Sequence, residues 1–271
     1  MKNIVFLVLL FACISCTSQT SQSPGSTFVF RGVNVIPMDK MEILSNQDVV
    51  VKDGKIASIS PASTIQHEKN AVLIDAKGKY LLPGLAEMHA HVPPVDDIEP
   101  MKDVAKLFAL RGVTTIRGML GHPRHLELRE KIKSGEIFGP RFITSGPSVN
   151  GTTANTAAKA ESLVRDQQKA GYDFLKLHPG IKKENFAVIA ATAKAVNIPF
   201  AGHVSFDVGV WRAINAGYTT IDHLDGFIES LVPGIENIRE EDAGLFGLYL
   251  ADKADETLIG KLVDSLLAHK I

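Results

Sequence analysis

Strand-like and helix-like segments alternate in this sequence, from residue 83 onward, with a nearly constant period. Six β-rich runs end at positions 91, 117, 146, 176, 203 and 223, so consecutive ends lie 20 to 30 residues apart. Segments with apolar residues at helical spacing lie between them, at residues 101–110, 125–133, 154–170, 182–195 and 208–216. A repeat of this length is typical of a strand, a crossover helix and the next parallel strand. The sequence therefore predicts an α/β fold with a parallel sheet.

The position of the polar side chains favours a closed parallel barrel over an open, doubly wound parallel sheet. They stand at the carboxyl ends of the β-rich runs, as in a (β/α)8 TIM-type barrel, and no Gly-x-Gly-x-x-Gly of a dinucleotide fold follows the first run. A whole barrel takes about 250 residues, whereas residues 83–271 hold only about six βα units. We therefore expect residues 83–271 to form an incomplete barrel, from a C-terminally truncated form of a longer protein or from a fragment gene.

Residues 27–82 have a different pattern, with short β-rich runs and no helical segment. Asp53-Gly54 lies between the runs 48–52 and 55–59. This dipeptide predicts a β-hairpin, because both of its positions tolerate a positive φ. We expect a small N-terminal β-module ahead of the barrel.

The first 26 residues have the features of an export signal and a tether. Lys2 precedes an apolar run at residues 4–14, which is too short to span a bilayer as a helix. Ile14-Ser15-Cys16 resembles a bacterial lipoprotein signal, in which Cys16 becomes the lipidated N-terminus; an ordinary secretory signal is the alternative. Residues 17–26 are rich in Ser, Thr and Gln and predict a flexible tether. We expect an exported lipoprotein of the cell envelope that faces the periplasm and contacts the membrane only through its lipid anchor.

Composition excludes some functions. A net charge of -1 and the lack of a basic stripe argue against a nucleic-acid partner. Both cysteines, Cys13 and Cys16, precede the folded part, which therefore contains no disulfide and no thiolate metal site. Whether the chain forms a homo-oligomer stays open.

Histidines and one lysine stand at the strand ends. His89 and His91 share one face of a strand, because side chains alternate with period two, so they form half of a metal site or are two polar residues at a strand end. Lys176 lies in the apolar run 174–177 and is costly to bury as an ammonium. Its neutral amine can react with carbon dioxide to give a metal-bridging carbamate; alternatively, the side chain reaches the rim or pairs with an acid. With His203 and His223, these donors suit a divalent metal such as zinc.

Taken in order, these segments resemble the amidohydrolase superfamily of metal-dependent hydrolases, and within it the imidazolonepropionase-like and Xaa-Pro or Xaa-Arg dipeptidase-like group. The resemblance covers residues 28–271 and rests on the 53–56 hairpin, Pro83-Gly84-Leu85 leading to His89-Ala90-His91, and the segments 112–117, 139–141, 173–176, 201–203 and 222–225. It implies hydrolysis of a C–N amide bond in a small dipeptide or cyclic amide by a metal-bridging hydroxide. It also implies that the N-terminal β-module is of the β-sandwich type.

The resemblance also implies roles for single residues. His89 and His91 would hold the more buried of two zinc ions, His203 and His223 the more exposed one, and carboxylated Lys176 would bridge them. The family's last catalytic element, an aspartate after the eighth strand, has no counterpart here, so no catalytic acid or base is identified. A non-catalytic remnant and a solute-binding lipoprotein are therefore alternatives.

Three further residues receive predictions. His178 lies two positions after Lys176 and either lines the substrate pocket or belongs to a loop. Arg117 either contacts a substrate carboxylate or pairs with a neighbour. His125 is expected at the surface.

Overall fold

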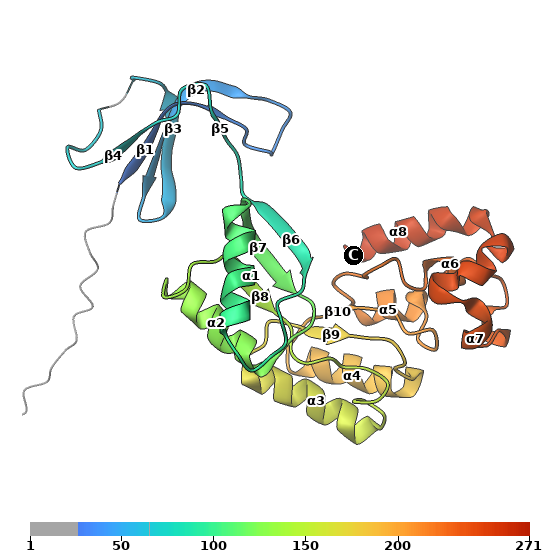
Figure 1. Cartoon of the computed structure of the whole chain (residues 1–271). Coiled ribbons are helices and arrows are strands. Elements are labelled where there is room, and N and C mark those ends of the chain that lie inside the picture. Colours follow the sequence, from blue (N-terminus) through green and yellow to red (C-terminus); the bar gives the residue numbers. More distant parts are fainter. Residues whose placement is uncertain (1–26, 65) are drawn as a thin grey trace, which may run out of the picture. The chain divides into compact units, whose positions relative to one another are not determined.

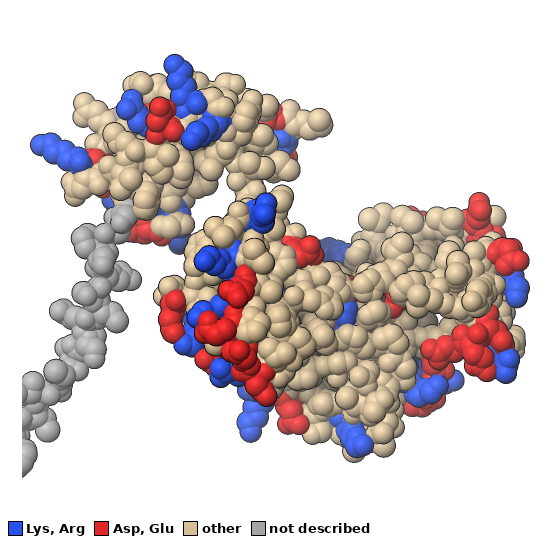
Figure 2. Space-filling model, viewed as in Figure 1, with Lys and Arg blue, Asp and Glu red and all other residues tan. Residues whose placement is uncertain are grey.

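The computed structural model describes residues 27–64 and 66–271, which divide into two compact units between Pro83 and Gly84 (Figure 1). The export signal and the lipidation at Cys16 lie outside the described residues and stay predictions. Of the helices that the structure describes, none is both long enough and apolar enough to cross a membrane. On the face shown in Figure 2, acidic and basic side chains are interspersed.

The first unit is a single five-stranded sheet of order β3-β2-β1-β4, with β5 also paired to β1. The strands are β1 (Phe28–Val35), β2 (Leu44–Lys52), β3 (Lys55–Pro61), β4 (Val72–Asp75) and β5 (Tyr80–Leu81). The expected hairpin joins β2 to β3, and Asp53 (φ 52°) and Gly54 (φ 72°) both adopt positive φ there. The second layer of a sandwich is not among the described residues, so that feature stays a prediction.

Strand β1 continues through an irregularity at Gly32. Gly32 has a φ of 67°, and the pairing with β2 shifts register between Phe30 and Val33. The buried carboxylate of Asp48 accepts hydrogen bonds from the backbone N–H groups of Gly32 and Ser63, each at 3.0 Å. The irregularity in β1 is therefore stabilised by a side chain of the neighbouring strand β2.

The second unit contains a wall of parallel strands. Its strands are β6 (Leu85–Ala90), β7 (Val113–Gly118), β8 (Arg141–Thr144), β9 (Leu175–Leu177) and β10 (Phe200–Gly202). β6-β7-β8 form one sheet and β9-β10 another, and parallel bridges from Ser145 to Phe174 and from Val149 to Leu177 join the two. A last bridge pairs Gly202 with Ile221. The parallel strands β6 to β10 and the bridged segment at Ile221 therefore follow one another in chain order. This confirms the α/β class and the parallel order.

Helices follow the strands as expected. They are α1 (Glu99–Leu110), α2 (Pro123–Lys133), α3 (Ala157–Ala170), α4 (Lys183–Ala195) and α5 (Val210–Ala216). Figure 1 shows α1 to α4 along one side of the strands, and the largest buried cluster packs α3 and α4 against β9 and β10 through residues such as Val164, Leu175, Phe186 and Ile189. This packing fixes the strand ends that carry Lys176 and His203.

The sixth predicted strand, at residues 218–223, is confirmed only in part. The backbone N–H groups of Thr219 and Asp222 donate to the carbonyls of Phe200 and Gly202, and Ile221 bridges Gly202. The chain then leaves the sheet, because His223 (φ 60°) and Leu224 (φ 59°) are left-handed. The segment beyond is made of short helices and ends in a longer one: α6 (Phe227–Ser230), η1 (Ile235–Asn237), α7 (Glu240–Ala243), η2 (Leu245–Lys253), η3 (Glu256–Leu258) and α8 (Ile259–His269).

Strand β6 is an edge of the described wall. Its Leu85 and Met88 are 60% and 46% exposed, and within the described residues only β7 pairs with it. Closure of the wall into a barrel is therefore still a prediction.

His125 is a buried residue of α2, and its expected place at the surface is wrong. Its side chain is fully buried, packs at 5.6 Å from the Phe142 ring and has Nε2 3.1 Å from the carbonyl oxygen of Pro93. Because α2 begins at Pro123, the helix directs position 125 towards β8. Burial lowers the pKa of His125 below its ordinary value.

The buried His125 should make the free energy of unfolding depend on pH. The unfolded chain takes up a proton at this histidine near pH 6.5, whereas the folded chain does not, so stability falls as pH drops through about 6.5. We expect His125→Gln to show a smaller stability loss between pH 7.5 and pH 5.5 than the unchanged chain. Urea unfolding with a chelator present measures this, and His269→Gln, at an exposed position, is the matched control. Equal pH dependence in the unchanged and His125→Gln chains would contradict the prediction.

Candidate metal centre

Four imidazoles meet at the carboxyl ends of the strands. His89 lies in β6 and His91 directly after it, and their rings stack at 5.3 Å with planes 15° apart. The ring of His223 lies 4.7 Å from that of His89 and 4.7 Å from that of His203. The structure therefore brings together the four histidines that the sequence singled out.

Lys176 belongs to β9, and only 1% of its side chain is exposed. Its ammonium donates a hydrogen bond to the carboxylate of Asp222 and forms an ion pair with it. A Cβ on the neighbouring Gly202 would lie 2.9 Å from Cδ of Lys176, so a glycine there leaves room for the lysine. Burial lowers the pKa of Lys176, and Asp222 acts in the opposite direction.

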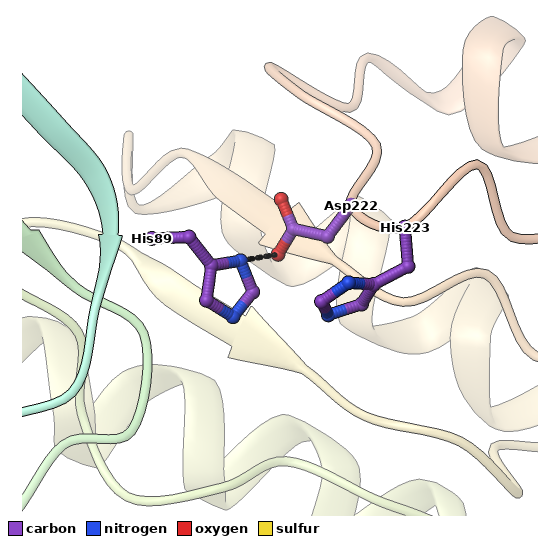
Figure 3. Close-up of side chains that lie close together, drawn as sticks. All are labelled: His89, Asp222 and His223. Atoms are coloured by element: carbon purple, nitrogen blue, oxygen red, sulfur yellow. Dashed lines mark ion pairs between the residues drawn. The ribbon is translucent and has the colours of Figure 1, made fainter.

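Asp222 is a site residue that the sequence predictions missed. Its Oδ2 lies 3.5 Å from Nδ1 of His89, and its Oδ1 lies 3.7 Å from Nη2 of Arg117. Figure 3 shows the side chains of His89, Asp222 and His223 converging. Each offers one ligand atom, and these atoms lie within 4.8 Å of one another.

This donor set fits a divalent metal. Imidazole nitrogens and carboxylate oxygens are ligands that zinc accepts. His89 is partly exposed and His223 is exposed, so both rings have freedom to adjust on metal binding.

The period-two rule explains why Asp222 was missed. In a regular strand, Asp222 and His223 would point to opposite faces. The left-handed turn at His223 and Leu224 instead directs both side chains towards His89. A signal was present nevertheless, because a buried lysine needs an acid and Asp222 is an acid at a predicted strand end.

His203 is oriented by a second acid. Its Nδ1 lies 2.6 Å from Oδ2 of Asp225, and the Tyr218 hydroxyl donates a 2.8 Å hydrogen bond to the backbone oxygen of His203. Partners of this kind fix the ring of a metal-binding histidine and leave its other nitrogen for the metal. Burial raises the pKa of Tyr218, so its hydroxyl stays a donor at neutral pH.

Arg117 and His178 border the same group. The Arg117 guanidinium donates to the Met88 carbonyl at 2.8 Å and to Oγ1 of Thr220 at 3.1 Å, so it connects β6 to the segment that carries Asp222. His178 stacks on His203 at 5.4 Å, and its Nδ1 lies 2.9 Å from Oγ of Ser148. Burial lowers the pKa of His178 to about 4, so its ring is neutral at neutral pH.

Comparisons with known proteins were made by family, by sequence and by structure. No known family model matches the chain. "Adenine deaminase 1" of Jannaschia sp. is 24% identical over 217 residues, which are 72% of this chain and 35% of that protein. "L-hydantoinase" of Paenarthrobacter aurescens is 42% identical over 53 residues, or 20% of this chain and 11% of that protein.

A solved structure matches more of the chain. The putative prolidase from Bifidobacterium longum superposes with a TM-score of 0.66 at 23% identity, over 90% of this chain and 71% of that one. By contrast, the chain spans only about a third, or less, of the length of the curated relatives it matches. The structural likeness shows a shared fold.

Proposed function

We propose that this chain, which belongs to the amidohydrolase superfamily, acts as a metal-dependent hydrolase of C–N bonds. The observation that carries the proposal is that several donors converge at the carboxyl ends of the parallel strands: His89, Lys176, Asp222, His203 and His223. Relatives named adenine deaminase, L-hydantoinase and prolidase support it, since these are hydrolases of C–N bonds.

Two metal positions are part of the proposal. His89 and His91 would hold the more buried zinc ion, His203 and His223 the more exposed one, and carboxylated Lys176 would bridge them. Asp222 adds a carboxylate beside His89. When bound, such metals supply a Lewis acid and a hydroxide at neutral pH.

The chain's own groups would bind the substrate and move the proton. Neutral His178, with Nδ1 held by Ser148, can offer Nε2 to a polar group of the substrate. Asp222 is the acid among the donors, so we assign to its Oδ2 the transfer of the proton to the leaving amine. Asp225 holds the His203 ring in place through the 2.6 Å contact at Nδ1.

The proposed substrate is a small dipeptide or a cyclic amide. The name prolidase supports the former and the name L-hydantoinase the latter. We also propose that the protein works at the cell envelope, facing the periplasm, with Cys16 as the lipid attachment point.

Metal content and turnover should change together. We expect the purified full chain to carry about two zinc ions and to hydrolyse a member of a panel of dipeptides and hydantoins. His203→Asn should lower kcat/KM by about 10–100-fold or more, as losing even an outer partner of a metal ligand does. Elemental analysis and an amine-release assay measure the two quantities.

The matched control is His269→Asn, at an exposed position in α8. It should leave both readouts unchanged. Turnover that survives complete chelation would refute the proposal, and metal binding without turnover of any substrate would favour a non-catalytic protein.

A further inference from the structure

The cavity beside His203 is lined by acids. It has a volume of about 190 Å³, and its walls include His203, Asp225, Glu229, Glu240 and Phe246. Among the described residues, no lysine or arginine lines it. A hollow with three carboxylates and no basic side chain favours a positively charged occupant.

Asp225 is the most deeply placed of these acids, with 5% of its surface exposed. Its Oδ2 lies 2.6 Å from Nδ1 of His203. Its Oδ1 is buried and has no hydrogen-bond partner in the part of the chain that the structure describes. A buried carboxylate oxygen without a donor is costly, so a ligand that supplies a donor would be bound there.

Glu229 places a second such oxygen on the wall. Its Oε2 is also buried and lacks a partner among the described residues. Burial raises the pKa of Glu229, and the nearby negative charge of Asp225 adds to this. A Cβ on Gly247 would lie 3.0 Å from Oε2, so a glycine there lets η2 close over the carboxyl group.

We propose that this cavity is the subsite for a primary ammonium group of the substrate. An ammonium has three N–H donors, and the unpartnered oxygens of Asp225 and Glu229 are two acceptors for them. The volume of about 190 Å³ equals about six water molecules at ~30 Å³ each, which is enough for a short aminoalkyl chain. The cavity begins at His203, so the ammonium lies on the same substrate whose amide bond is cleaved. The inference rests on the proposed function and deepens it.

Binding is tested on the zinc-loaded full chain by calorimetric titration with 1-aminopentane and, in parallel, with neutral 1-pentanol. We expect the amine to bind at least tenfold more tightly. Glu229→Gln should remove most of this difference, whereas Glu241→Gln, an exposed acid of α7 outside the cavity lining, should retain it. Equal binding of amine and alcohol by the unchanged chain would overturn the subsite, whether or not Glu229→Gln folds.

Turnover separates the subsite from the proposed function. A dipeptide containing lysine should have about tenfold higher kcat/KM than the same dipeptide with norleucine, through a lower KM, and Glu229→Gln should remove most of that preference. Hydrolysis without an ammonium preference would overturn the subsite and leave the function standing. Selective amine binding with no hydrolysis of either dipeptide would uphold the subsite and reject the function.

Discussion

Replacing Lys176 with methionine is expected to lower the unfolding free energy of the metal-free chain by about 3–5 kcal/mol, because it leaves a buried carboxylate without its partner. The lysine and Asp222 side chains are only 1% and 6% exposed, and a second cation, the Arg117 guanidinium, lies farther away, 3.7 Å from Oδ1 of Asp222. Adding Asp222→Asn removes the uncompensated charge. The double variant should therefore recover most of the lost stability, although it should still fail to bind zinc.

A double-mutant cycle measures this pair. Urea unfolding of the unchanged chain, the two single variants and the double variant, all in chelator, gives the coupling energy. Lys261→Met is the control, since this lysine lies on α8 and outside the site. A double variant no more stable than Lys176→Met would contradict the prediction, because the loss would then come from packing around the lysine stem.

Replacing Phe186 with alanine should cost about 3–5 kcal/mol of unfolding free energy, as for other buried aromatic residues. Phe186 is 1% exposed, and its ring lies 6.2 Å from that of Phe200 and 6.0 Å from that of Tyr218. The effect should reach the site, because the Tyr218 hydroxyl holds the backbone of His203 at 2.8 Å. We therefore also expect weaker zinc binding.

Denaturant unfolding and zinc titration measure the two effects of Phe186→Ala. Phe138→Ala is the matched control, because Phe138 is 63% exposed. An equal loss of stability in both variants would argue against the buried aromatic cluster as the support of β10. Unchanged zinc affinity in Phe186→Ala would show that packing in this core does not affect the position of the metal ligands.

Local rules of sequence predicted much of this structure. Asp53-Gly54 predicted its hairpin because the requirement for positive φ is met within two residues. Period-two alternation predicted that His89 and His91 share a face, and their rings stack with planes 15° apart. The order of the strands followed from the repeat length, since parallel neighbours need a crossover helix.

Predictions failed where distant contacts decide the local conformation. The run 218–223 has strand propensity, yet its chain leaves the sheet after Ile221, so Asp222 joins the site. His125 is polar, yet α2 turns it into the core, where it meets Phe142 and the Pro93 carbonyl. Neither outcome follows from strand propensity or from side-chain polarity, because both depend on contacts with residues far away in the sequence.

The left-handed residues His223 and Leu224 put folding stability and metal binding in conflict. Neither residue is a glycine, and each adopts a φ near +60°, which costs about 1–2 kcal/mol per residue. Any substitution that relaxes this turn would make the chain more stable and, at the same time, let Asp222 and His223 separate from His89. Stability screens on this protein would therefore enrich changes at position 224 that weaken metal binding, so variants chosen for heat resistance should be assayed for metal before use.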